Sequence, residues 1–267
     1  HLEEKLKQGT YTDLKPAYTN GISKVYGADQ PYAPIILSGD SHSAAYLDGV
    51  YQWAHDVKGK PLEFIGRAAC QLSGDDQHQI WNKEKCQTFR AELNRRIEDT
   101  QHPIDYLIFA NRYDGLIIDM ASNNVSAEAV DRFYKRNAQK FLDGVVYTLE
   151  KMKKYPPEGK VIVMGQVPKL AMSPKHCAQR EKVLMNKIVN NDYECVPYTV
   201  DPLIDEKVVR PFNAALKELL SKYDNGIYFD PDRPFPPNEN DRWWVYYKDH
   251  NHLSHEGGFY LSSFFNF

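Results

Sequence analysis

The stretch PIILSGDSHS, residues 34–43, places an apolar run directly before a group of small and polar residues. Its IIL segment is apolar at every position, which is typical of a short strand that is buried on both faces. Gly39 permits a tight turn at the carboxyl end of that strand, and either Asp40 or Ser41 can cap a following helix. Ligands of open α/β sheets bind at this edge. A helix cap alone would also explain the serine, so this stretch predicts a fold but not a function.

Apolar runs and stretches of helical period alternate along the rest of the chain. The expected strands are residues 34–38, 62–66, 105–111, 160–165 and 226–230. The expected helices are residues 42–57, 86–99, 127–154 and 205–223. Strands separated by helices of this length favour crossover units and a parallel sheet, so we predict an α/β fold, a three-layer α/β/α sandwich. Residues 1–30 show no sustained period and are expected as a linker or an extension packed on the domain formed by residues 31–267.

The overall composition excludes several classes of partner. A chain of 267 residues suits one large α/β domain, and its net charge of −3 gives no electrostatic reason to expect nucleic acid or an anionic membrane. No apolar run approaches the roughly 20 residues that span a bilayer, and the start HLEEKLKQGT is not typical of a signal peptide. We therefore expect a cytosolic protein or a soluble piece of something larger.

The four cysteines are Cys70, Cys86, Cys177 and Cys195. No C-x-x-C pair occurs, which disfavours a structural zinc site. Four cysteines allow three disulfide connectivities, and the sequence does not choose among them. Four reduced thiols in a cytosolic enzyme remain an alternative at this point.

A second cluster of polar residues lies in KDHNHLSHEGG, residues 248–258, before an expected final helix. Asp249 precedes His252 by three residues, so the carboxylate can fix the imidazole tautomer and stabilise its charged form. A serine beside such a histidine becomes a nucleophile for acyl transfer. The same stretch contains the histidine pattern H-x-H-x-x-H (His250, His252 and His255), which also occurs in metal sites. No matching ligand cluster appears elsewhere in the sequence, so no metal is expected.

The motif GDS at residues 39–41 and the D-x-x-H motif at residues 249–252 resemble the end motifs of the SGNH (GDSL) hydrolase superfamily. GDSHS and DHNHLSHEGG are more specifically similar to the SGNH domain fused behind the acyltransferase-three membrane domain of bacterial glycan O-acetyltransferases. The resemblance covers residues 31–267 and implies a flavodoxin-like α/β/α fold with a parallel sheet. By analogy, the catalytic residues are Ser41 as the nucleophile, His252 as the general base and acid, and Asp249 as its orienting partner.

The middle motifs of the superfamily concern the oxyanion hole. Gly66, which closes the second expected strand, is the candidate for a glycine whose backbone N–H binds the oxyanion. The third motif is usually G-x-N-D, whereas this chain has FANRYDG, which places Arg112 at the asparagine position. The resemblance therefore implies that the backbone N–H groups of Ser41 and Gly66 hold the oxyanion together with the side chain of Asn111 or Arg112. A salt bridge to Asp114 is the alternative role of Arg112.

The resemblance also implies a compartment. Fused SGNH domains act in the periplasm or at the extracytoplasmic face of the bacterial inner membrane, where disulfides persist. On sequential proximity we predict that Cys70 pairs with Cys86 and Cys177 with Cys195. The first bridge would brace the loop that follows Gly66.

The function that the resemblance implies is serine-dependent O-acetylation of a bacterial cell-surface glycan, such as lipopolysaccharide O-antigen or peptidoglycan. No bound cofactor is expected, because the acetyl donor would come in trans or from the fused membrane domain. Two alternatives are a carbohydrate acetyl esterase with the same triad and a non-catalytic glycan-binding module, which has no need of a triad. His42 is expected at the start of a helix or on the substrate side. The aromatics of residues 242–250 are expected to pack on the domain or to stack on a sugar ring.

Overall fold

The chain folds around a seven-stranded sheet with the strand order β1-β2-β4-β3-β5-β6-β7. The computed structural model describes residues 14–71, 80, 84–117, 126–170, 202–232, 234 and 247–267. The strands are β1 (Tyr18–Asn20), β2 (Ser23–Tyr26), β3 (Ile35–Gly39), β4 (Leu62–Gly66), β5 (Tyr106–Ala110), β6 (Lys160–Met164) and β7 (Gly226–Phe229). The strands β3, β4, β5, β6 and β7 are parallel, and β3 lies between β4 and β5. This is the flavodoxin-like order, which confirms the predicted sheet.

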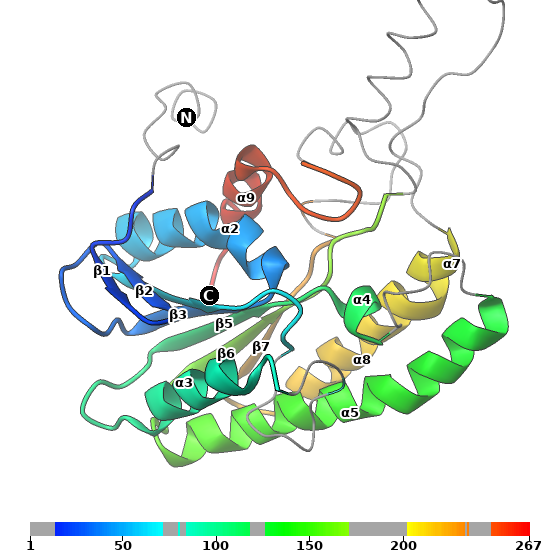
Figure 1. Cartoon of the computed structure of the whole chain (residues 1–267), viewed down its shortest axis with the longest axis horizontal. Coiled ribbons are helices and arrows are strands. Elements are labelled where there is room, and N and C mark those ends of the chain that lie inside the picture. Colours follow the sequence, from blue (N-terminus) through cyan, green and yellow to red (C-terminus); the bar gives the residue numbers. More distant parts are fainter. Residues whose placement is uncertain are drawn as a thin grey trace, which may run out of the picture.

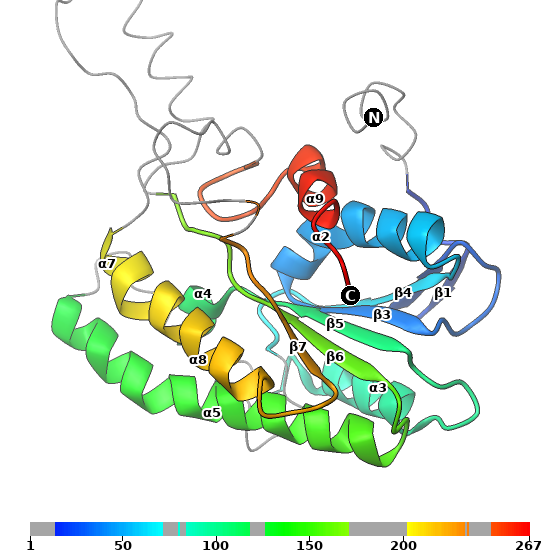
Figure 2. The same ribbon diagram turned by 180° about the vertical axis from the view of Figure 1, so that it is seen from behind.

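Helices cover both faces of this sheet, which gives the predicted three layers (Figures 1 and 2). One face carries α2 and α9, and the other carries α3, α5 and α8. The helices are α2 (Ser41–Gln52), η1 (Trp53–Val57), α3 (Gln87–Glu98), α4 (Tyr113–Ile117), α5 (Ala127–Lys154), α7 (Pro202–Ile204), η2 (Asp205–Val209), α8 (Arg210–Leu220) and α9 (His255–Ser262). Within the described ranges, no helix combines the length and apolar character that crossing a membrane requires.

The apolar run in β3 explains why this strand lies in the middle of the fold. Ile36 belongs to the core cluster that contains residues of α3, α5 and α8, whereas Ile35 and Leu37 belong to the cluster that contains residues of α2 and α9. All three side chains are completely buried. Burial of a side chain of this size contributes about 1.5–3 kcal/mol to folding. A strand that is buried on both faces therefore needs apolar residues at every position.

Residues at the amino-terminal side of the domain form an antiparallel hairpin at one edge of the sheet. Strand β1 pairs with β2, and β2 runs antiparallel to β4. Gly21 begins the two-residue turn between them and has a φ of +59°, in the left-handed region that glycine adopts at little cost. These residues fall in the segment expected as a linker or a packed extension. The domain division at residue 31 stays a prediction.

A buried ion pair ties this hairpin to the body of the fold. The Nε of Arg96 on α3 lies 2.8 Å from a carboxylate oxygen of Glu63 on β4, and neither side chain is exposed. The other carboxylate oxygen of Glu63 accepts a hydrogen bond of 2.7 Å from Ser23 on β2. Arg96 also donates to the backbone carbonyls of Ala33 and His102. One charged pair thus connects the hairpin, the central sheet and a covering helix.

Several boundaries differ from the sequence-based expectation. The helix expected over residues 42–57 ends in a π-helical turn, η1, and the helix expected over 205–223 is divided into η2 and α8. The short helix α4 was not expected. The hairpin of β1 and β2 was also not expected, whereas the five strands of the parallel sheet and the helices between them occur in the predicted order.

Candidate active site

Ser41 is held at the carboxyl end of the central strand by its two preceding residues. Gly39 has a φ of +140°, and a Cβ atom there would lie 2.1 Å from the carbonyl oxygen of Ala110. Only glycine therefore fits this turn. Asp40 is the N-cap of α2 and accepts a hydrogen bond of 2.8 Å from the backbone N–H of His42. Of the two capping residues that the sequence allowed, Asp40 caps the helix, and Ser41 occupies its first position.

The Asp40 carboxylate also connects two neighbouring turns of the sheet edge. Its second oxygen accepts a hydrogen bond of 2.9 Å from the backbone N–H of Arg112, at the end of β5. Burial alone would raise the pKa of Asp40, but the nearby His42 side chain and the two N–H groups lower it below its usual value. From the sequence, Asp40 is expected only as a helix cap. Its second contact depends on the neighbouring strand and has no local sequence signal.

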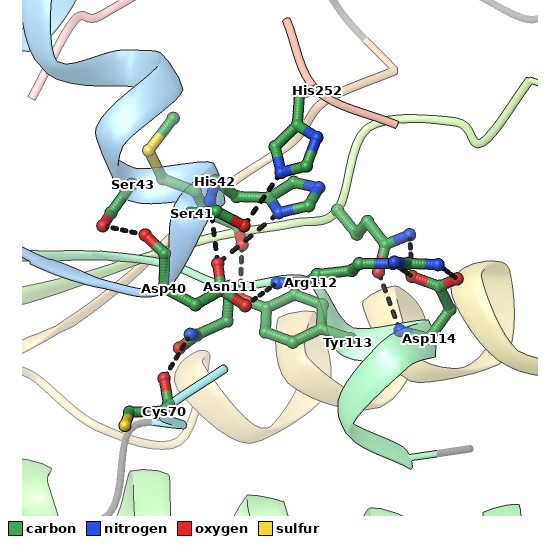
Figure 3. A network of polar contacts seen from close by, with 12 residues as sticks. Asp40, Ser41, His42, Ser43, Cys70, Asn111, Arg112, Tyr113, Asp114 and His252 are labelled. Atoms are coloured by element: carbon green, nitrogen blue, oxygen red, sulfur yellow. Dashed lines mark hydrogen bonds and ion pairs between the residues drawn. The ribbon is translucent and has the colours of Figure 1, made fainter. Parts of the chain in front are cut away.

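Ser41, His252 and Asp249 form a continuous chain of hydrogen-bonding distances. The Oγ of Ser41 lies 2.8 Å from Nε2 of His252, and Nδ1 of His252 lies 2.9 Å from a carboxylate oxygen of Asp249 (Figure 3 shows the Ser41–His252 pair). A carboxylate only accepts hydrogen bonds, so Nδ1 carries the proton and Nε2 is free to accept one from the serine. The structure thus brings together the three predicted catalytic residues, although the serine and the histidine are 211 positions apart in the sequence.

Asp249 is fixed by its own loop. Its other carboxylate oxygen accepts the backbone N–H groups of Asn251 and His252 at 2.9 and 2.8 Å. Burial raises the pKa of Asp249, but the hydrogen bonds from the His252 ring and the two N–H groups outweigh it and hold the pKa well below its usual range. The carboxylate is therefore charged at neutral pH and can stabilise a protonated His252.

The close contact of α2 and α9 places the His252 loop over the start of α2 (Figure 1). A Cβ atom at Gly49 would lie 2.0 Å from the carbonyl oxygen of Gly258, and one at Gly258 would lie 2.8 Å from that of Ala45. Glycine on both helices therefore permits the backbones to approach closely. The same two helices are joined by an ion pair between His255 and the buried carboxylate of Asp48.

Gly66 lies at the same edge as the serine. It ends β4 and is the register partner of Gly39, and the N–H of Arg67 donates to the carbonyl of Gly39 at 3.0 Å. A Cβ atom at Gly66 would lie 2.2 Å from the Phe64 ring. The position agrees with that expected of an oxyanion glycine, and the role itself stays a prediction.

The amide of Asn111 is directed toward the loop after β4, away from Ser41 (Figure 3). It is buried and donates a hydrogen bond of 3.0 Å to the carbonyl of Cys70. Cys70 forms a disulfide with Cys86, which confirms the first predicted pair. The predicted pair of Cys177 and Cys195 lies outside the described residues.

The guanidinium of Arg112 is engaged by a neighbouring carboxylate. Its Nε and Nη2 lie 3.0 and 3.1 Å from the two oxygens of Asp114, and Figure 3 shows the side chain extending away from Ser41. Burial would raise the pKa of Asp114, but the charge of Arg112 lowers it. Gln166, directly beyond β6, exchanges two further hydrogen bonds with Asp114. Arg112 thus forms the salt bridge to Asp114 that was expected as its alternative role, and the Asp114 carboxylate is buried. Oxyanion binding by Asn111 or Arg112 stays a prediction that the side-chain directions do not favour.

The three histidines of the H-x-H-x-x-H pattern have separate surroundings. His252 belongs to the triad, and His255 pairs with Asp48. His250 is half-buried, and burial lowers its pKa despite the nearby charge of Asp249. In the part of the chain that the structure describes, no three His, Cys, Asp or Glu residues are placed to hold a metal ion.

The aromatic stretch before the triad is described only from Tyr247 onward. Tyr247 is buried in the core beneath α2 and α9, and its hydroxyl donates to the carbonyl of Pro168 at 2.7 Å. Tyr247 therefore packs on the domain, which is one of the two roles expected for the aromatics of this stretch. Residues 242–246 lie outside the described part.

Comparisons with known proteins concern the family and the fold of this chain. A family model described as the SGNH domain (fused to AT3 domains) matches residues 10–266. The periplasmic domain of the Salmonella ser. Paratyphi A lipopolysaccharide acetyltransferase is 14% identical, with a TM-score of 0.55 over 86% of this chain and 80% of that chain. A GDSL-like lipase from Parabacteroides merdae is 12% identical, with a TM-score of 0.43 over 86% of this chain and 91% of that one. These structural likenesses concern the fold alone. A comparison with curated protein sequences gave no match.

Proposed function

This chain belongs to the family of SGNH domains that are fused to AT3 domains, and we propose that it transfers acetyl groups to a hydroxyl of a bacterial cell-surface glycan through Ser41. The observation that carries the proposal is the chain of hydrogen bonds from Ser41 through His252 to Asp249. A nucleophile, a base and an orienting carboxylate in contact are the parts that acyl transfer by a serine requires. A glycan-binding module has no need of them.

In the first step, His252 Nε2 takes the proton of Ser41, and Oγ attacks the carbonyl carbon of the acetyl donor. Asp249 stabilises the imidazolium that results. The bond to the leaving group then breaks, the leaving group receives the proton from His252, and Ser41 carries the acetyl ester. In the second step, a glycan hydroxyl gives its proton to His252 and attacks the acetyl carbon. Ser41 departs with that proton, which restores the free enzyme and leaves an acetylated sugar.

Both steps develop negative charge on the acetyl oxygen. We assign the donors to the backbone N–H groups of Ser41 and Gly66, because both residues lie at the carboxyl edge of the sheet. The first turn of α2 also supplies the positive end of a helix dipole. Loss of one oxyanion donor typically costs roughly a hundred- to a thousandfold in turnover, which is large but less than the loss of a triad member.

The proposed setting follows from the family. An AT3 membrane domain in the full-length protein would supply the acetyl group, so the SGNH domain itself needs no bound cofactor. The periplasm or the extracytoplasmic membrane face is the proposed location, and the Cys70–Cys86 disulfide is of the kind that persists there. The proposed acceptor is lipopolysaccharide O-antigen or peptidoglycan.

A carbohydrate acetyl esterase is the second candidate. The His252 and Asp249 side chains are 26% and 36% exposed, so water has access to the base that would activate it. Hydrolysis of the acetyl-enzyme by water uses the same residues as transfer. Exclusion of water decides between the two outcomes.

The test is incubation of the protein with para-nitrophenyl acetate and isolated O-antigen or peptidoglycan fragments, followed by mass spectrometry of the glycan. We expect an acetylated glycan from the wild type, and free acetate alone would favour the esterase. Ser41→Ala and His252→Ala should each lower turnover of the ester by up to about a millionfold, because triad members act as a unit. Ser263→Ala, an exposed serine after α9, is the control and should keep the wild-type rate. More than about a tenth of that rate in Ser41→Ala would refute the assignment of the nucleophile, because removal of a triad serine lowers turnover by several orders of magnitude.

A further inference from the structure

His42 is a buried imidazole that lies against the ring of His252 (Figure 3). Its side chain is 1% exposed, and the two ring centroids are 4.6 Å apart with an angle of 33° between the planes. Nδ1 of His42 lies 3.5 Å from a carboxylate oxygen of Asp40, an ion-pair contact that is longer than a usual hydrogen bond. Both ring nitrogens are buried without a hydrogen-bond partner.

This environment is unfavourable for a histidine that has only a structural role. Burial of a polar ring without hydrogen bonds costs free energy that an apolar side chain of similar size would not cost. Among the described residues, most of the buried side-chain atoms without a hydrogen-bond partner belong to His42, Asn111 and Asn251, and one belongs to Asn225 at the start of β7. His42 and Asn251 are sequence neighbours of Ser41 and His252, and Asn111 follows β5 at the same edge of the sheet. The cost is therefore concentrated at the active site.

The hydrogen bonds of His252 leave one motion of its ring weakly restrained. Ser41 and Asp249 hold the two ring nitrogens, which flank Cε1 of the imidazole. The ring can still pivot by small rotations about its Cα–Cβ and Cβ–Cγ bonds, and such a pivot changes the direction in which Nε2 faces Ser41. A flat surface packed against the ring opposes the pivot. His42 supplies that surface from the first turn of α2.

We propose that His42 is a positioning residue, whose flat face fixes the plane of the His252 imidazole for proton transfer to and from Ser41, the leaving group and the acceptor. The proposal rests on the proposed acyl transfer through Ser41. His42 acts through its ring face, because neither of its nitrogens contacts Ser41 or His252 by a hydrogen bond. It is therefore not a second general base.

The test compares His42→Phe with His42→Leu, since both remove the ring nitrogens and only phenylalanine keeps a flat ring. Turnover of para-nitrophenyl acetate needs no glycan, and it gives kcat and KM separately. We expect His42→Leu to lower kcat by about 10- to 100-fold with an unchanged KM, because a small misplacement of a catalytic group costs up to about a hundredfold. His42→Phe should stay within a few-fold of the wild-type kcat. The downfield proton resonance of the His252–Asp249 hydrogen bond should broaden in the leucine variant and stay sharp in the phenylalanine variant.

Equal kcat values for the leucine variant and the wild type would overturn the proposal. So would an equal loss in both variants, since the ring nitrogens would then matter. If the larger phenylalanine prevents folding, the leucine variant alone tests the proposal. A lower kcat with an unchanged KM would then support it. Ser41→Ala measured in the same assay separates the two claims: an inactive Ser41→Ala together with a fully active His42→Leu refutes only the role of His42.

Discussion

Asp40 shows how a single residue can serve the fold and the site together. Its carboxylate binds the N–H of His42 through one oxygen and the N–H of Arg112 through the other. It thereby fixes the turn that carries Ser41 against the turn that ends β5. Because the carboxylate is buried and charged, its contribution to stability depends on pH.

We predict that Asp40→Asn lowers the free energy of unfolding at pH 7 by about 1–3 kcal/mol, since an amide NH₂ would replace an oxygen that accepts an N–H. The pKa of Asp40 is lower in the folded protein than its ordinary value. Its stabilising effect is therefore complete above the unfolded pKa of about 3.9 and is lost as the pH falls through the folded pKa. The difference between variant and wild type should be constant from about pH 7 to 5 and should narrow below about pH 4. Urea unfolding over this range measures it.

The control for this prediction is Asp131→Asn, which removes an exposed carboxylate of α5. It should change the stability little at any pH. A difference between Asp40→Asn and the wild type that stays the same in acid would show that the charge of Asp40 does not contribute.

At this scale the sequence predicted the members of the triad better than the residues around them. Ser41, Asp249 and His252 stand in short motifs at strand and helix ends, and the resemblance of these motifs to those of the SGNH superfamily selected them. The orientation of Asn111 and Arg112 depends on the carbonyl of Cys70 and the carboxylate of Asp114. Which partner a long polar side chain chooses depends on the folded surroundings, and the motif FANRYDG does not contain that information.

At the scale of elements, the contact between α2 and α9 decides whether the serine and the histidine meet. The two backbones approach closely because Gly49 and Gly258 have no side chain. One helix begins with the nucleophile, and the other follows the His252 loop directly. A change in the spacing of the helices therefore changes the distance within the triad.

We predict that Gly49→Ala displaces α9, because its Cβ would lie 2.0 Å from the carbonyl oxygen of Gly258. Turnover of the acetyl ester should fall by about a hundredfold, which is the cost of a misplacement of roughly 1 Å. The stability should fall by about 1–3 kcal/mol, as is usual for an overpacked contact. Steady-state kinetics and thermal unfolding measure the two effects. Glu256→Ala on the exposed side of α9 is the control, and wild-type turnover in Gly49→Ala would contradict the prediction.

The elements that the sequence predicted are those with a strong local pattern. Strands β3 to β6 have five residues each and are mostly apolar, with helices between them, and strands buried on both faces are typically apolar. Strands β1 and β2 have three and four residues and are stabilised by their pairing with β4. Their local signal is Gly21 at the first position of the two-residue turn, and a single glycine is too weak to predict a hairpin. The five-residue helix α4 is too short to show a period.

At the scale of the whole molecule, the Glu63–Arg96 pair holds together segments that are distant in sequence. We predict that Arg96→Met lowers the free energy of unfolding by about 3–5 kcal/mol, because it leaves the Glu63 carboxylate buried without its counter-charge. The double variant Glu63→Gln/Arg96→Met removes both charges and should be more stable than the single variant. Urea unfolding compares the three proteins. A loss of less than about 1 kcal/mol in Arg96→Met, the range of an exposed pair, would contradict the buried role.

The separation of 211 positions between Ser41 and His252 has a consequence for biosynthesis. At about 5–20 residues per second, the ribosome adds the histidine roughly 10–40 s after the serine. Throughout that interval the growing chain carries Ser41 without the His252 base that activates it. Reactivity toward acyl esters then arises in one step, when α9 docks on α2. Labelling of Ser41 by an acylating reagent thus reports that synthesis has passed residue 252 and that the last helix has reached its place.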